Sequence, residues 1–179
     1  MSTVVKSIRT PLDEMTIRML NCGDPVLITG ELLTARDAAH RLLVERLGRG
    51  LNLPVDLKGR VLFYAGPSPK PPGRIAGAIG PTTSGRMDPY TIPLLEAGLK
   101  GMIGKGRRSE EVRRSMLEHG AVYFAAIGGT AVLLSRCIAY VEPVAFEEMG
   151  PEAIFRLDVV DFPVYVVNDV RGGDLYSEN

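Results

Sequence analysis

The sequence predicts a single domain of mixed α and β structure, because strand-like segments alternate with segments of helical periodicity. Residues 26–33 and 60–65 are apolar runs rich in β-branched and aromatic residues, which is typical of strands. Between them lies one apolar set at helical spacing, made of Ala35, Ala39, Leu42, Leu43 and Leu47. No repeat period interrupts this pattern, so we expect residues 1–179 to share one core.

The composition narrows the classes of function. Lys plus Arg equals Asp plus Glu at 21 each, so the formal net charge is zero. Such a chain has no overall field to attract nucleic acid or an anionic membrane, and we expect neither as a partner. No apolar run reaches the roughly 18 residues of a transmembrane helix. The first residues also lack the apolar core of a signal peptide, which predicts a cytoplasmic location.

The chain is poor in soft metal ligands, since it has only two cysteines and two histidines. Cys22 and Cys137 lie far apart and form no C-x-x-C pair. We expect two buried thiols rather than a disulfide, and no metal site within this chain.

The remaining elements are predicted from turn residues and apolar patterning. An edge strand over 4–9 ends at Pro11. Thr34 is expected to cap a helix that runs to residue 47, with Asp37 at its third position. Residues 66–73 are rich in proline and glycine and predict an exposed loop. Further on, we expect strands over 75–79, 101–104, 121–126 and 137–146, helices over 90–99, from 109 and over 131–136, a turn or short helix over 147–152, and β-rich segments over 154–160 and 164–167.

The most distinctive stretch is Gly80-Pro81-Thr82-Thr83-Ser84-Gly85-Arg86-Met87-Asp88, between a predicted strand and a predicted helix. The free N–H groups at a helix start bind anions, and the three hydroxyls and Arg86 add donors that suit a carboxylate. The alternative is that Thr82, Thr83 or Ser84 is only a helix N-cap. The helix itself starts either at Asp88 or after a short turn over 83–87.

A second corner, Gly104-Lys105-Gly106-Arg107-Arg108-Ser109, follows the predicted strand over 101–104. Its glycines let the backbone approach a ligand, and Lys105 offers a point charge to an anion. The spacing does not fit a phosphate-binding P-loop, because Gly106 follows the lysine where that motif needs Ser or Thr. Ser109 is expected to cap the next helix, and Arg107 and Arg108 are expected to be solvated.

Arg36 and His40 lie one turn apart at the start of the first long helix. A cation at a helix N-terminus opposes the helix dipole, so Arg36 either serves a ligand or tolerates a small cost. His40 by itself is interpreted as a structural or surface histidine, with proton handling as the alternative.

These motifs resemble the β subunit of class I fumarate hydratase and its relative, L-tartrate dehydratase. The resemblance extends over about residues 25–176 and includes the segments 29–32, 34–40, 64–67, 127–129 and 161–163. It implies a swivelling β/β/α domain. It also implies a cysteine-rich α subunit, or an α-like domain, whose [4Fe-4S] cluster binds the substrate hydroxyl and one carboxylate through an open iron.

The resemblance also implies a role for each site residue. Thr82 would be the catalytic base that takes the C3 proton, and Arg36, Arg86 and Lys105 would bind the substrate carboxylates. A free hydroxyl is a poor base, so Thr82 would need activation by its neighbours. His40 is the second candidate for proton handling, and Thr83 and Ser84 are secondary site candidates.

The function implied is the interconversion of (S)-malate with fumarate plus water, by a two-chain hydro-lyase in a higher oligomer. L-tartrate and mesaconate remain alternative substrates, since Arg107 stands where many fumarate hydratases have Asn. A different class of function also stays open, a non-catalytic anion-binding or interaction module of the same fold.

Overall fold

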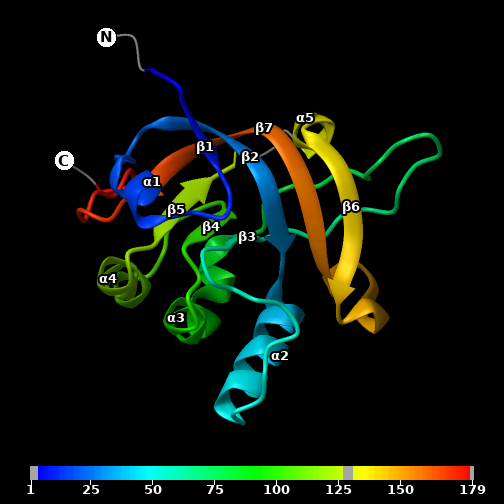
Figure 1. Cartoon of the computed structure of the whole chain (residues 1–179), viewed down its shortest axis with the longest axis horizontal. Helices are drawn as coiled ribbons and strands as arrows, with labels where there is room; N and C mark the ends of the chain where they lie inside the picture. The colour runs from blue at the N-terminus through cyan, green and yellow to red at the C-terminus, as the bar shows by residue number, and fades with distance from the viewer. Residues whose placement is uncertain (1–3, 127–130, 178–179) are drawn as a thin grey trace.

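A computed structural model describes residues 4–126 and 131–177, so the predicted motif at residues 127–129 lies outside the described residues. The described chain is of mixed α and β structure, as predicted (Figure 1). Its strands are β1 (Lys6–Arg9), β2 (Pro25–Thr34), β3 (Val61–Phe63), β4 (Gly101–Gly104), β5 (Val122–Ala125), β6 (Ile138–Ala145) and β7 (Ile154–Asn168). The α-helices are α1 (Glu14–Arg18), α2 (Asp37–Gly48), α3 (Asp88–Glu96), α4 (Glu110–His119) and α5 (Ala131–Arg136), and the 3-10 helices are η1 (Ser84–Met87) and η2 (Glu147–Glu152).

The sheet closes on itself. The strand order is β1-β2-β3-β4-β5-β7-β6, and β2 additionally pairs with β7. Strands β2, β3, β4 and β5 are parallel to one another, and β7 is antiparallel to both β2 and β5. These five strands therefore form a barrel-like ring, with β1 and β6 attached outside it. Helices α2, α3 and α4 lie side by side below the ring in Figure 1.

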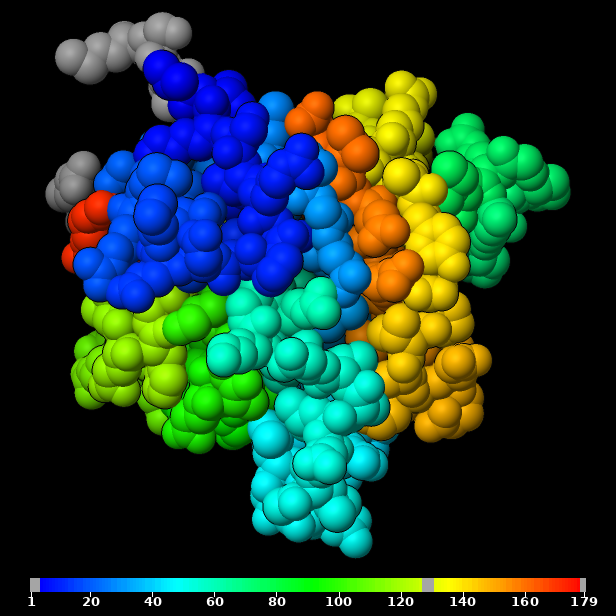
Figure 2. All heavy atoms as spheres, in the orientation of Figure 1, coloured from blue at the N-terminus to red at the C-terminus, as the bar shows by residue number. Residues whose placement is uncertain are grey.

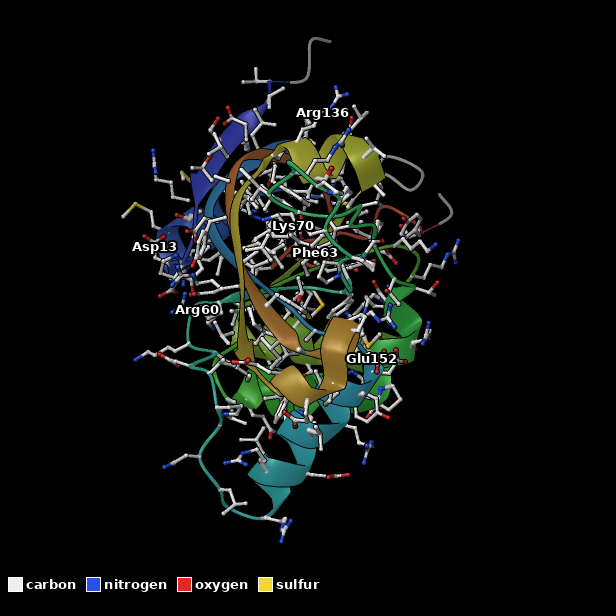
Figure 3. All side chains as sticks on the ribbon, turned by 90° about the vertical axis from the view of Figure 1, so that its right-hand side faces the viewer. Asp13, Arg60, Phe63, Lys70, Arg136 and Glu152 are labelled. Atoms are coloured by element: carbon white, nitrogen blue, oxygen red, sulfur yellow. The ribbon has the colours of Figure 1, made fainter. Side chains whose placement is uncertain are left out.

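Alternation along the parallel strands divides the apolar core into two parts. Val61 and Phe63 of β3 join the cluster inside the ring, whereas Leu62 joins the cluster beneath helices α2 to α4. Strands β4 and β5 alternate in the same way. Inside the ring the Phe63 side chain, labelled in Figure 3, packs edge to face on Phe162 of β7 at 5.3 Å between ring centroids.

The predicted strand over 75–79 is wrong. These residues follow the proline-rich loop, and part of the segment between β3 and η1 protrudes beside β6 (Figure 2). The Ser68 N–H donates to the Ala78 carbonyl at 3.0 Å, and a Cβ on Gly77 would collide with the Ser68 carbonyl. The Ala78 carbonyl is thus bonded within the loop and not to a neighbouring strand.

The structure also locates the first residues of two helices. Arg36, not Thr34, is the N-cap residue of α2. Thr34 is instead the last residue of β2, where its Oγ1 accepts from the Phe155 N–H at 3.1 Å. At the central corner the short-turn alternative is confirmed, because η1 precedes α3.

The two β-rich segments predicted near the C-terminus are one strand, β7, bent at Asp161. None of the described helices is both long enough and apolar enough to cross a bilayer.

Candidate active site

Two of the predicted site residues follow parallel strands at the same edge of the sheet. Arg36 comes two residues after β2, and Lys105 comes directly after β4. Strands β2, β3 and β4 are parallel neighbours, so their carboxyl ends meet at this edge. Ligands bind outside the carboxyl ends of parallel strands, both in open sheets and in barrels. The fold thereby brings two separate cations to a place suited to a ligand.

The central corner joins this edge through backbone hydrogen bonds. The Thr82 N–H donates to the Tyr64 carbonyl at 2.6 Å, and the Lys105 N–H donates to the Thr82 carbonyl at 3.2 Å. The Ser84 N–H in turn donates to the Lys105 carbonyl at 2.8 Å, so Thr83 and Lys105 form a parallel β-bridge. Thr82 is half-buried, and Thr83 and Lys105 are exposed. The two corners predicted separately from the sequence are therefore one structural unit.

Ser84 holds this unit from inside rather than facing solvent. Its side chain is buried, and its Oγ lies 2.8 Å from the Tyr123 hydroxyl, which itself donates to the Gly106 carbonyl at 2.8 Å. Burial is the main cause that raises the pKa of Tyr123. A Cβ on Gly104 would collide with the Ser84 Oγ, so glycine is required there for the close approach. Ser84 thus supports the corner by packing.

The two arginines of the predicted site meet at the N-terminus of α2. Arg86 donates from Nε to Oδ1 of Asp37 at 3.0 Å and from Nη2 to Oδ2 at 2.7 Å. Arg36 donates from Nε and Nη2 to one oxygen of Glu152 at 3.2 and 2.7 Å. Arg86 is therefore bound by the residue that directly follows Arg36 in the chain. Lys105 makes no ion pair with any residue in the described ranges 4–126 and 131–177.

His40 lies beneath this arrangement and is fully buried. Its Nδ1 is 2.8 Å from the Arg36 carbonyl, and its ring packs edge-on to Tyr64 at 5.2 Å. Burial lowers the pKa of His40 to about 4, so the ring is neutral at pH 7. A neutral ring donates from Nδ1 to the carbonyl, which leaves Nε2 as an acceptor without a partner among the described residues. This position favours an orienting role through Arg36.

Arg108 was expected to be solvated, and that expectation is wrong. Its guanidinium is fully buried between the rings of Tyr64 and Tyr123, at 5.3 and 5.2 Å from their centroids. It donates to Asp88 Oδ1 at 2.7 Å, to Thr91 Oγ1 at 2.7 Å and to the Tyr64 hydroxyl at 3.0 Å. The second oxygen of Asp88 accepts from the backbone N–H that follows Arg108, at 2.7 Å. Arg108 and Asp88 therefore tie the two corners together.

Local sequence could not reveal this role, because the partners of Arg108 come from three separate segments. Arg107, its neighbour, is exposed as expected, with its guanidinium carbon 6.0 Å from the centroid of the Tyr176 ring.

Two hollows on the described surface lie away from the predicted site. The larger, of about 670 Å³, is lined in part by Lys100, directly before β4, and by Gly120, two residues before β5. It therefore lies at the opposite edge of the sheet. The second, of about 310 Å³, lies between α4 and the segment after β7. The predicted residues form an open edge that belongs to neither hollow.

This chain's residues do not fit an iron–sulfur cluster, which needs about three or four thiolates close together. Within residues 4–126 and 131–177, no three His, Cys, Asp or Glu side chains are grouped to hold a metal ion. Cys22 and Cys137 are free thiols, as expected, although each is half-buried rather than buried. Burial is the main cause that raises the pKa of both.

Comparison with known proteins identifies the family. The family model described as Fumarase C-terminus matches residues 3–179. "Fumarate hydratase 2" of Leishmania major is 36% identical over 182 residues, which cover 99% of this chain and 32% of that protein. "Fumarate hydratase class I, anaerobic" of Escherichia coli K12 is 40% identical over 154 residues, 84% of this chain and 28% of that protein.

A shorter relative matches along most of its length. The "Putative L(+)-tartrate dehydratase subunit beta" of Methanocaldococcus jannaschii is 35% identical over 173 residues, which cover 93% of this chain and 89% of that protein. The chain thus spans about a third of the fumarate hydratases it matches but nearly all of this subunit. From the family match over nearly its whole length, the chain belongs to the Fumarase C-terminus family.

Proposed function

We propose that this chain is the β subunit of a [4Fe-4S]-dependent hydro-lyase that interconverts (S)-malate with fumarate plus water. One observation carries the proposal. In a member of the Fumarase C-terminus family, Thr82, Arg86 and Lys105 share one hydrogen-bonded corner that an ion pair joins to the Arg36–Asp37 segment. Three cations and a hydroxyl at one sheet edge suit a dicarboxylate that loses a proton.

The proposed roles follow from the charge that the reaction develops. Arg36, Arg86 and Lys105 bind the two carboxylates, and Thr82 takes the proton from C3 of malate. As that C–H bond breaks, negative charge builds up in the adjacent carboxylate. Cations already directed at that carboxylate stabilise the transition state more than the substrate. His40 remains the second candidate for proton handling, and Thr83 and Ser84 remain secondary candidates near Thr82.

The cluster is assigned to a partner, because this chain's own thiols do not fit it. The partner is a cysteine-rich α subunit, and the two chains form a higher oligomer in the cytoplasm. The M. jannaschii relative is named as a subunit β, which supports a separate partner chain. Within this proposal the fold is of the swivelling β/β/α class, which the barrel-like ring with helices on one side supports.

Co-expression with such an α subunit under anaerobic conditions tests the proposal. We expect the assembly to hydrate fumarate, and Thr82→Ala or Arg86→Ala to lower kcat/KM by roughly 10²-fold or more. Arg41→Ala is the matched control for Arg86, since Arg41 is an exposed cation of α2 paired with Glu45. Its activity should be unchanged. Full activity of the partner without this chain would instead identify a non-catalytic module.

A second candidate, L-tartrate dehydratase, is favoured by the similar length of the M. jannaschii relative. The same assembly should be supplied in turn with fumarate, L-tartrate and mesaconate. The highest kcat/KM identifies the substrate, and we expect it for fumarate.

A further inference from the structure

Two acidic side chains hold the arginines of the proposed site by the same edge of the guanidinium, Asp37 with two oxygens and Glu152 with one. Asp37 receives Nε and Nη2 of Arg86, and Glu152 receives Nε and Nη2 of Arg36. In both arginines, Nη1 forms no hydrogen bond with a residue in the described part of the chain. Glu152 lies on η2, which packs near the start of α2 (Figure 3). The Arg86–Asp37 pair spans 49 residues of sequence and the Arg36–Glu152 pair spans 116, so both pairs are tertiary contacts.

A guanidinium has five N–H donors, and a carboxylate bound at the Nε and Nη2 edge uses only two of them. The remaining donors include one on each Nη atom, which together form a second fork of the same planar geometry. A substrate carboxylate can therefore bind each arginine without displacing Asp37 or Glu152.

The approach of Glu152 to Arg36 depends on a residue without a side chain. A Cβ on Gly66 would lie 2.7 Å from the Pro151 carbonyl oxygen and 3.1 Å from Nη1 of Arg36. Gly66 thus leaves room for η2 and the Arg36 guanidinium to lie together. A larger residue at position 66 would therefore disturb the Arg36–Glu152 ion pair.

We propose that Asp37 and Glu152 are positioning residues, which orient Arg86 and Arg36 so that their second forks face the substrate. This inference rests on the proposed function. The opposite reading is that the two carboxylates compete with the substrate for the arginines. The two readings predict opposite signs, because removing a competitor tightens substrate binding and removing a positioning group weakens it.

The test measures steady-state kinetics of the assembled enzyme with fumarate. Long arginine side chains lose much rotamer freedom on binding, so we expect Asp37→Asn and Glu152→Gln each to raise KM about tenfold. We expect kcat to fall as well, because the same arginines stabilise the charge that develops in the transition state. Asp37→Glu, which keeps the charge, should restore part of the affinity. Glu45→Gln is the matched control, since Glu45 also pairs with an arginine, Arg41, but away from the site, and its KM should not change.

A double-mutant cycle separates positioning from a general structural effect. In the Arg86→Ala background, Asp37→Asn should raise KM no further, because its target is already gone. An additive effect, an unchanged KM in both single variants, or a lower KM would overturn the inference. The two proposals are contradicted by different results. A wild-type assembly without hydro-lyase activity overturns the proposed function. An active enzyme whose KM is unchanged by Asp37→Asn and Glu152→Gln overturns only this inference.

Discussion

Arg108 shows how a single buried cation fixes the geometry of the proposed site. Its guanidinium is fully buried, and its ion-pair partner Asp88 has a side chain that is 15% exposed. Burying a charge costs free energy, and this cost is offset only where the charge is paired and its donors are bonded. Here Asp88, Thr91 and Tyr64 provide those acceptors. The residue therefore contributes to stability only as part of the complete group.

Replacing Arg108 with methionine should lower the free energy of unfolding by roughly 3 to 5 kcal/mol, because Asp88 is left without its counter-ion. Chemical denaturation of the purified chain measures this. Arg107→Met is the control, and its cost should stay below about 1 kcal/mol because Arg107 is exposed. Equal effects of the two substitutions would contradict the structural role given to Arg108.

His40 makes stability depend on pH in a defined direction. Its pKa is about 4 in the folded chain, against 6.5 for an ordinary histidine. Between these values the unfolded chain binds a proton that the folded chain does not. The stabilisation is therefore complete above pH 6.5 and is lost as the pH falls toward about 4, by at most about 1.4 kcal/mol per pH unit.

Denaturation at several pH values between 5.0 and 6.5 tests this dependence. His40→Gln should remove most of the slope in that interval, whereas His119→Gln at the other histidine should leave it. A wild-type slope that survives His40→Gln would show that another group is responsible.

At the scale of elements, β7 joins two parts of the sheet by bending. Asp161 has a φ of 51°, in the left-handed region, between two extended segments of the strand. Its N–H donates to Thr29 Oγ1 at 3.1 Å, and the register between β2 and β7 shifts near this point. Asp adopts this conformation more easily than β-branched residues do. The bend explains why the pattern looked like two separate strands.

Substitution at Asp161 should therefore follow backbone preference. Asp161→Gly should be close to neutral, and Asp161→Val should cost roughly 1 to 3 kcal/mol, because valine is strained at a positive φ. Thermal or chemical denaturation of the two variants makes the comparison at a single position. A valine variant as stable as the glycine variant would argue against this geometry.

At the scale of the whole molecule, the pairing of β2 with β7 closes the ring and encloses a core. Phe63 and Phe162 meet inside it, and both are fully buried. Closing a sheet removes the unpaired edges that an open sheet would expose on these strands. The site lies at one edge of this ring, so its geometry depends on the entire sheet.

Phe162→Ala should therefore destabilise the whole domain, by about 3 to 5 kcal/mol, through a cavity in the ring core. Phe155→Ala on the same strand is the control, and it should cost less because Phe155 is only half-buried. Denaturation measures both. Native-state hydrogen exchange should also become faster in β2 and β7 together in the Phe162 variant.

The sequence by itself determined the local features of this protein. Three of them are predicted from residues close together in the sequence: the β-branched strand β2, the glycine-bounded strand β4 and the Ser109 cap of α4. The structure confirms each. The mixed α and β class and the family were also accessible, because they depend on patterns and motifs within short windows.

Only the tertiary structure decided how these features meet. The closure of β2 on β7, the burial of Arg108, and the pairing of Arg36 with Glu152 join residues that lie far apart in the chain. The strand expected over 75–79 does not form for the same reason, since the Ala78 carbonyl accepts from the Ser68 N–H of the same loop and not from a strand. Periodicity reports which face of a segment is apolar, but the folded chain determines which segment covers that face and whether a charge there finds a partner.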